Sequence, residues 1–233
     1  MRIALMVLKL IYAVPYYMLR MIWMGKHSTK EKAFSFVKKC TKKANKAGKV
    51  RIASYGVDKL PKEDGYVLFP NHQGMYDVLI FLDSCPRPFS FVVKKELKNV
   101  ILLKQAISCL HSLAIDRKDL RQSMEVIKEM TERVKNGENF LIFAEGTRSR
   151  MGNRMLDMKA GSFKSAVKAQ APIVPCALID CFKPFDEKGT KELTVQVHYL
   201  DPIYYEEYKD MSTQEIASMV KERIEKVLFT FPQ

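Results

Sequence analysis

The sequence predicts an α/β fold in which a single domain carries a mostly parallel, mixed sheet covered by helices. From residue 50 onward, short apolar segments of strand length alternate with segments of helical periodicity, which is typical of a sheet covered on both faces. The basic excess is confined to residues 1–60, which hold 14 Lys and Arg against two acidic residues, whereas residues 61–233 hold 25 against 24. We therefore expect an N-terminal helical pair over residues 1–47 and one α/β domain over residues 48–233.

Seven short segments predict the strands of the sheet. They are apolar or alternate between apolar and polar residues, and they comprise residues 50–55, 66–70, 89–93, 113–115, 139–143, 173–178 and 193–197. Helices are expected near residues 77–84, 96–110 and 162–169 and in two longer segments. In the first longer helix, one face is expected to comprise Leu120, Met124, Ile127 and Val134. The second longer helix begins at the capping pair Ser212 and Glu215. Its inward-facing side chains are expected to be Ile216, Met219, Val220, Ile224 and Val227.

Residues 1–24 are almost entirely apolar and carry several aromatic side chains. Lys9 and Arg20 break the run, whereas a spanning helix needs about 20 uninterrupted apolar residues. A cleaved signal peptide fits poorly, because no small-residue cleavage site follows the apolar core. Tyrosine and tryptophan suit the headgroup region of a bilayer. We expect a segment that lies in one leaflet and kinks at Pro15, with a spanning helix as the alternative.

Residues 28–47 predict a basic amphipathic helix that begins at the capping pair Ser28 and Glu31. Its apolar face comprises Ala33, Val37, Cys40, Ala44 and Ala47, and seven lysines occupy most of the rest. This combination favours an anionic membrane surface, with a solvated charged face as the simpler alternative, and no motif indicates nucleic-acid binding. We expect a peripheral or monotopic protein of the cell membrane whose α/β domain lies on the cytoplasmic face.

The cysteines give no sign of a disulfide framework or of a metal site. They are odd in number and scattered, and they comprise Cys40, Cys85, Cys109, Cys176 and Cys181. None belongs to a Cys-x-x-Cys pair, and the four histidines are far apart in the sequence. We expect reduced thiols in a cytosolic environment and no zinc site.

His72 and Asp77 lie in a turn between a buried strand and a helix, where α/β proteins commonly place their sites. Five extended residues span roughly 16 Å, so this turn must fold back if the two side chains are to meet. Gly74 is expected to ease the turn through its backbone freedom. With a carboxylate on one ring nitrogen, the other nitrogen accepts a proton and serves as a general base for an alcohol. A surface or helix-capping histidine is the alternative.

A second polar block follows the apolar strand at residues 139–143 and comprises Glu145, Gly146, Thr147, Arg148 and Ser149. The arginine offers a planar fork suited to a phosphate, and backbone amides around the glycine add donors. The two hydroxyls add further hydrogen-bonding groups, and the glutamate either holds an arginine in place or accepts a substrate hydroxyl. A polar surface loop with ion pairs is the simpler alternative.

Together the two blocks resemble the glycerolipid acyltransferases, and within them the 1-acyl-sn-glycerol-3-phosphate O-acyltransferases. The resemblance rests on Asn71-His72-x4-Asp77 followed by Phe143-x-Glu145-Gly146-Thr147-Arg148-Ser149. Further similar segments follow in the expected order, namely Lys94–Leu97, Ile115–Arg117, Lys159-x-Gly161 and Ala171–Pro175. The resemblance covers roughly residues 50–200. The departures are Gly74 for a common serine, Ala144 for a common proline, Met158 for a common phenylalanine, and a missing Pro and Gly after Leu97.

The resemblance implies transfer of a fatty acyl group from a thioester to the 2-hydroxyl of lysophosphatidate, which gives phosphatidic acid. It implies His72 as the general base, Asp77 as its orienting partner, and a glycerol-phosphate site formed by Glu145, Gly146, Thr147, Arg148, Ser149, Arg117 and Lys95. The expected partners are lysophosphatidic acid, anionic phospholipids, and acyl carrier protein or coenzyme A as the thioester carrier. No cofactor or metal is expected. The alternatives are glycerol 3-phosphate or another lysophospholipid as the acceptor, and a non-catalytic protein that binds anionic lipid.

Overall fold

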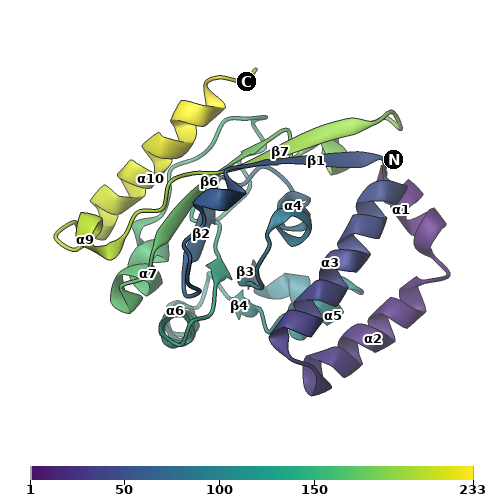
Figure 1. The fold of residues 1–233 in the computed structure, drawn as a ribbon, viewed down its shortest axis with the longest axis horizontal. Helices are drawn as coiled ribbons and strands as arrows, with labels where there is room; N and C mark the ends of the chain where they lie inside the picture. The colour runs from purple at the N-terminus through teal and green to yellow at the C-terminus, as the bar shows by residue number, and fades with distance from the viewer. Residues whose placement is uncertain (1, 233) are drawn as a thin grey trace.

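The computed structural model describes residues 2–232, and it contains one seven-stranded sheet with helices on both faces (Figure 1). Residues 1 and 233 of the predicted domain ranges lie outside the described residues. The strand order is β1-β7-β6-β2-β5-β3-β4, and every neighbouring pair is parallel except β6 and β7. The strands are β1 (Val50–Tyr55), β2 (Val67–Pro70), β3 (Ser90–Lys94), β4 (Leu113–Ile115), β5 (Phe140–Leu141), β6 (Ile173–Ile179) and β7 (Leu193–Tyr199). The predicted mixed, mostly parallel sheet is confirmed.

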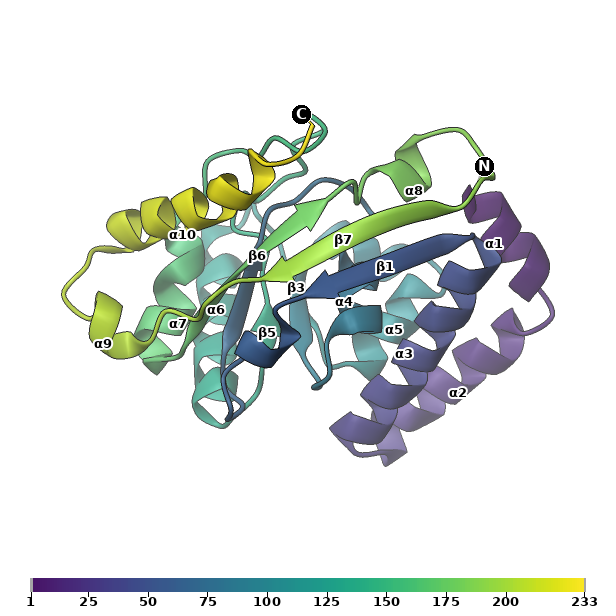
Figure 2. The same cartoon turned by 45° about the horizontal axis from the view of Figure 1, so that its top comes forward.

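Ten α-helices and three 3₁₀ helices connect and flank the strands within residues 2–232. The α-helices are α1 (Arg2–Leu10), α2 (Val14–His27), α3 (Lys30–Ala47), α4 (Asp77–Ser84), α5 (Leu103–Cys109), α6 (Leu120–Lys135), α7 (Lys164–Ala169), α8 (Lys183–Asp186), α9 (Tyr205–Tyr208) and α10 (Thr213–Leu228). The 3₁₀ helices are η1 (Val57–Lys59), η2 (Lys95–Asn99) and η3 (Ala160–Phe163). Figure 2 shows α3 and α2 beyond one side of the sheet and α10 with α7 beyond the other.

Strand β2 lies at the centre of the sheet and divides the core into two layers. All four of its residues are buried, and alternate side chains point to opposite faces. Leu68 belongs to the apolar cluster that includes residues of α2, α3 and α4, whereas Val67 and Phe69 belong to the cluster of α6, α7 and α10. The ring of Phe69 stacks on Phe163 at 4.2 Å between centroids. Burial on both faces explains why this strand is continuously apolar rather than alternating.

The register of β2 against β5 determines where the site is built. Leu68 lies opposite Leu141 in a parallel pairing. His72 lies four residues after Leu68, and Glu145 lies four residues after Leu141. Both polar blocks therefore lie at the same edge of the sheet, at the carboxyl ends of the parallel strands.

The N-terminal helices form a bent pair. Among residues 2–232, no single helix is both long and apolar enough to cross a bilayer, whereas α1 and α2 pass that criterion together and are bent by 83°. Pro15 lies in the first turn of α2, so the bend precedes the proline, whose ring fits a helix start. Helix α3 packs directly on the α/β domain, where Phe34 contacts Phe89 and Asn45 accepts a 2.6 Å hydrogen bond from the Tyr76 hydroxyl. The division into two units at residue 47 stays a prediction.

Three local predictions are wrong. Ser28 is the C-cap of α2, where its amide donates to the Met24 carbonyl, and the N-cap of α3 is Thr29, whose hydroxyl accepts from the Lys32 amide. Leu120 and Met124 of α6 are exposed, and the buried face runs through Val126, Met130, Thr131 and Val134. The helix expected over 96–110 is two helices, η2 and α5, separated by residues 100–102.

Candidate active site

The His72 and Asp77 side chains meet. His72 Nδ1 lies 2.7 Å from Asp77 Oδ2, and the Asp77 carboxylate also accepts hydrogen bonds from the backbone amides of Gln73 and Gly74 at 2.7 and 3.1 Å. Asp77 is completely buried at the first position of α4, where the helix dipole favours a negative charge. The carboxylate holds the proton on Nδ1, which leaves Nε2 as the acceptor. The His72 side chain is 19% exposed, so it remains accessible to a substrate.

Gly74 is needed for a different reason from the predicted one. The φ angle of Gly74 lies outside the left-handed region that favours glycine. A Cβ atom at this position would instead lie 3.0 Å from the Cα of Phe182, closer than side chains normally approach a backbone. The glycine therefore permits close packing between the His72 turn and the segment after β6.

Glu145 joins the two polar blocks through the backbone. Its Oε1 accepts a 2.6 Å hydrogen bond from the His72 amide, and its Oε2 accepts a 2.8 Å bond from the Leu156 amide. The Ser149 amide in turn donates to the His72 carbonyl at 2.8 Å. Burial of the side chain, which is 2% exposed, raises the pKa of Glu145 to about 7, and the two amide donors oppose that rise. The geometry makes Glu145 a positioning group for the His72 main chain.

Phe143 supports the histidine from the side of β5. The two rings stack with centroids 4.0 Å apart and planes inclined by 23°. This contact restricts rotation of the imidazole about its own axis, because the ring cannot turn edge-on without losing the stacking contact. The sequence carried no signal for this role, since Phe143 reads as the end of an apolar strand.

A buried amide network lies beneath the turn and was missed by the sequence analysis. Asn71 exchanges two hydrogen bonds with the backbone of Leu178, at 2.7 and 3.1 Å. Gln73 donates to Asn153 and to the Leu178 carbonyl and accepts from the Cys181 amide. These fully satisfied amides tie the His72 turn to β6, and satisfied buried networks hold one conformation. Asn71 and Gln73 flank His72 in the sequence, and Asn71 belongs to the motif quoted above, but amides in a loop read equally well as surface residues.

The remaining residues of the second block line the same edge. Gly146 has φ +75°, and the Lys159 side chain lies across it, with Nζ 3.0 Å from where a Cβ would be. Arg148 is half-buried and has no ion-pair partner among residues 2–232, while Thr147 is exposed. The Ser149 hydroxyl is buried and has no hydrogen-bond partner within the same range. This block therefore offers one unpaired cation and one unsatisfied hydroxyl close to His72.

Lys95 and Arg117 lie at the same edge but farther along the sheet. They follow β3 and β4, and β4 is three strand spacings, about 14 Å, from β2. Both residues are exposed, and Lys95 pairs with Asp116 at 3.4 Å. The structure thus groups the predicted residues into a compact set around His72 and an outlying pair.

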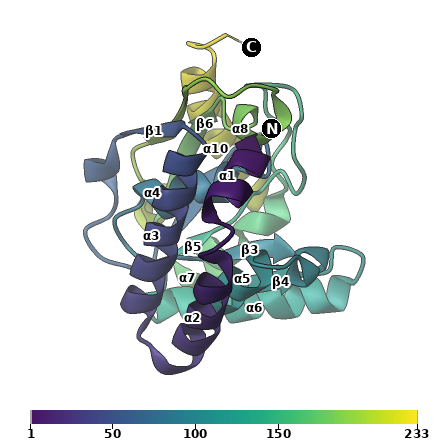
Figure 3. The same ribbon diagram turned by 90° about the vertical axis from the view of Figure 1, so that its right-hand side faces the viewer.

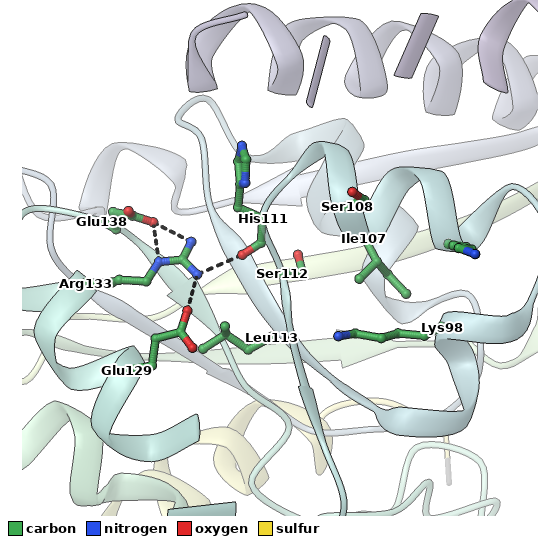
Figure 4. A pocket seen from close by; sticks show the side chains of 10 residues that line it. Lys98, Ile107, Ser108, His111, Ser112, Leu113, Glu129, Arg133 and Glu138 are labelled. Atoms are coloured by element: carbon green, nitrogen blue, oxygen red, sulfur yellow. Dashed lines mark hydrogen bonds and ion pairs between the residues drawn. The ribbon is translucent and has the colours of Figure 1, made fainter. Parts of the chain in front are cut away.

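No metal-binding cluster accompanies the site, since residues 2–232 contain no group of three or more His, Cys, Asp or Glu side chains arranged to hold an ion. A cavity of about 700 Å³ lies elsewhere, beside α5 and α6, and no predicted site residue lines it. Figure 4 shows Arg133 between Glu129 and Glu138 on one wall of this cavity and Lys98 on another.

The comparison with protein families shows to which family the chain belongs. A family model described as Acyltransferase matches residues 51–179, which include His72, Asp77 and the whole second block. The chain belongs to the acyltransferase family. Its sheet edge with paired His72 and Asp77 is therefore the candidate active site of an acyltransferase, as the sequence resemblance predicts.

Several relatives share the sequence or the fold. A 1-acyl-sn-glycerol-3-phosphate acyltransferase of Helicobacter pylori is 26% identical over 62% of this chain and 65% of its own length. One from Borreliella burgdorferi is 24% identical over 85% of this chain and 80% of its own length. A bovine protein named 1-acyl-sn-glycerol-3-phosphate acyltransferase alpha is 29% identical over 74% of this chain and 61% of its own length. This chain thus spans about two-thirds of the first and third of these relatives.

The fold has a solved counterpart. The crystal structure of the 1-acyl-sn-glycerophosphate acyltransferase PlsC from Thermotoga maritima superposes with a TM-score of 0.75 and 22% identity, over 99% of this chain and 97% of that one. The agreement extends over the N-terminal helices as well as the sheet.

Proposed function

We propose that this acyltransferase moves a fatty acyl group from a thioester to the sn-2 hydroxyl of 1-acyl-sn-glycerol 3-phosphate and so forms phosphatidic acid. The observation that carries the proposal is the 2.7 Å contact between His72 Nδ1 and Asp77 Oδ2 in a chain of this family. Arg148, which has no ion-pair partner among residues 2–232, lies in the loop whose Ser149 amide donates to the His72 carbonyl. The names of the relatives support the same acceptor. Acyl carrier protein or coenzyme A is the proposed thioester carrier.

The reaction needs one base and no covalent intermediate. His72 Nε2 takes the proton of the acceptor hydroxyl while the hydroxyl oxygen attacks the thioester carbonyl carbon. The resulting tetrahedral adduct collapses with cleavage of the carbon–sulfur bond, and the leaving thiolate receives the proton from the imidazolium. Asp77 stabilises the imidazolium and keeps the ring in the productive tautomer. A positioned general base contributes about 10²–10⁴-fold to the rate.

Arg148 is the proposed main phosphate contact. It follows β5, a strand adjacent to β2, and the amide of the next residue, Ser149, donates a 2.8 Å hydrogen bond to the His72 carbonyl, so Arg148 belongs to a loop that contacts the His72 turn. A guanidinium binds phosphate oxygens through two parallel hydrogen bonds. Arg117 and Lys95 lie about two and one strand spacings beyond β5, about 10 and 5 Å, and we assign them a weaker, longer-range attraction for the phosphate.

The N-terminal helices are proposed to hold the enzyme on the cytoplasmic face of the cell membrane. Nine large apolar residues of this segment are exposed, and we call them the N-terminal apolar face: Ile3, Val7, Leu8, Ile11, Tyr12, Tyr16, Leu19, Ile22 and Trp23. Arg20 stacks over the Trp23 ring at 4.7 Å, which places a cation and an aromatic ring together as they occur at headgroup level. The lysines of α3 add attraction for anionic lipid.

Acyl transfer from a labelled thioester to lysophosphatidate in vesicles tests the proposal. Intact protein, His72→Ala and the matched control His111→Asn are compared, since His111 is exposed and outside the site. We expect transfer at least about a hundredfold slower for His72→Ala and unchanged for the control. Parallel assays with glycerol 3-phosphate and other lysophospholipids identify the acceptor. Absence of transfer from both thioester carriers by intact protein that still binds lipid would contradict catalysis and favour a lipid-binding protein.

A further inference from the structure

Residues 100–102 form an exposed apolar loop that the proposed chemistry does not use. Val100, Ile101 and Leu102 are 44, 74 and 38% exposed and connect η2 to α5. Three consecutive large apolar side chains in contact with water are unfavourable for an isolated domain. They therefore indicate a surface that is covered in the working enzyme.

The backbone of this loop is strained at Leu102. Leu102 has φ +70° and ψ −44°, a conformation that large side chains rarely adopt. It also occupies the N-cap position of α5 without a capping hydrogen bond, where serine, threonine or aspartate would stabilise the helix. A residue that is unfavourable both in backbone and in solvation is expected at a functional contact.

The position of the loop connects the candidate active site with the N-terminal helices. Helix η2 follows β3 at the same sheet edge as His72, and the chain then continues through the loop into α5. Helix α5 packs tightly on α2, since a Cβ atom on Gly25 would lie 3.2 Å from the Cα of Cys109. Figures 1 and 3 both show α5 beside α2.

We propose that the 100–102 loop inserts into the membrane as a second contact, beside the N-terminal apolar face. The proposal rests on the proposed membrane association and extends it to the catalytic edge. A second anchored element on a neighbouring part of the molecule adds to the orientation that the bent helix pair gives the protein on the bilayer. The loop would bring the edge that carries His72 to the lipid surface from which the acceptor enters.

Charge complementarity identifies the partner as an anionic phospholipid layer. Lys98 and Lys104 flank the loop on both sides, and both are exposed. Lysines on either side of an apolar insertion lie at the height of lipid phosphates, because their stems follow the apolar surface while the ammonium groups remain in water.

Fluorescence from a tryptophan in the loop tests the insertion. Trp23 is the only tryptophan in the chain, so Trp23→Phe provides a silent background for Ile101→Trp. The control in the same background is Tyr204→Trp, an exposed aromatic position just before α9, at the end of the molecule remote from α2 and α5 (Figure 2). Vesicles contain equimolar phosphatidylcholine and phosphatidylglycerol, with bromine atoms at shallow acyl positions of the phosphatidylcholine.

We expect blue-shifted emission and loss of at least about half the intensity for Ile101→Trp, and neither change for the control. A second variant, Leu102→Gly, is expected to raise the melting temperature without vesicles, because glycine relieves the strain, and to weaken vesicle binding about tenfold. Co-sedimentation with vesicles separates the two proposals. Bound Ile101→Trp protein whose emission matches the control would overturn the loop insertion alone. Trp23→Phe protein that fails to co-sediment would overturn membrane association and the loop insertion together.

Discussion

The catalytic edge and the N-terminal helices represent opposite ways of organising a surface. At the catalytic edge, the buried Asp77 and Glu145 carboxylates accept hydrogen bonds from backbone amides, so the groups that orient His72 have fixed partners. On α1 and α2, the N-terminal apolar face is exposed, and Tyr12 has 95% of its surface in contact with water. The support of His72 is complete within the protein, whereas the apolar face is covered only when it contacts a bilayer, as proposed above.

This difference separates the chemical step from the presentation of substrate. Changes at the catalytic edge should alter the rate of transfer for any form of the acceptor and leave lipid binding intact. Changes on the N-terminal apolar face should alter lipid binding and leave transfer to dispersed, short-chain acceptor intact. The following predictions test that separation, and the largest expected effect comes first.

Asp77→Asn should slow transfer about 10²–10⁴-fold on bilayer and dispersed acceptors alike. The amide loses the charge that stabilises the imidazolium, and it has one acceptor oxygen in place of two for three donors. Steady-state assays on both acceptor forms, with vesicle co-sedimentation of the same samples, check the prediction. A large loss confined to bilayer acceptor would contradict it.

The combined variant Leu8→Ser, Tyr12→Ser, Leu19→Ser and Ile22→Ser should weaken vesicle binding by at least about a hundredfold, because it removes apolar surface that is available for insertion. Transfer to a dispersed acceptor should stay within about twofold of the intact protein, since these side chains are exposed. Tyr204→Ser with Phe229→Ser is the matched control for loss of exposed apolar groups. Equal loss on both acceptor forms, with folding shown to be intact, would contradict a purely presentational role.

Much of this architecture is predictable from the sequence, and the exceptions have physical causes. The positions of the strands follow from apolar periodicity. The contact between His72 and Asp77 follows if the turn between them folds back, as it does. Periodicity failed for α6, because Leu120 and Met124 are exposed in the first two turns of that helix, whereas its buried residues begin only at Val126. It failed for residues 96–110 because the strained Leu102 has no signature in an apolar run.

The site was less predictable than the fold. The amides of Asn71 and Gln73 and the ring of Phe143 support His72 through contacts with segments about 70 to 110 residues away in the chain. Such contacts depend on the order of strands in the sheet, which local patterns do not reveal. The same holds for the Glu145 carboxylate, which accepts hydrogen bonds from two backbone amides, while its predicted contact with substrate stays a prediction.

Glu145→Gln should change the pH dependence of stability. The pKa of Glu145 is about 7 in the folded protein against 4.5 for an ordinary glutamate, so the folded state retains a proton that the unfolded state releases. The free energy of unfolding should therefore fall as the pH rises from about 4.5 to 7, by at most about 3 kcal/mol. The glutamine variant lacks this contribution. Denaturant titrations across that range check the difference, and parallel curves for the two proteins would contradict it.

Thr29→Ala should destabilise the protein by about 0.5 kcal/mol, because it removes the N-cap of α3. Ser28→Ala at the neighbouring position should have an effect close to zero. Thermal unfolding of the two variants distinguishes them. A larger loss for the Ser28 variant would restore the capping pair predicted from the sequence and contradict the observed start of α3.

The central claim is that His72 and Asp77 act as one catalytic unit, and a double-mutant cycle tests it most directly. Single-turnover transfer is measured for His72→Ala, for Asp77→Asn and for the combined variant. If the aspartate acts only through the histidine, the combined variant should be within about threefold of His72→Ala alone. If the two losses multiply instead, the residues act independently, and the 2.7 Å contact between them is not the basis of catalysis.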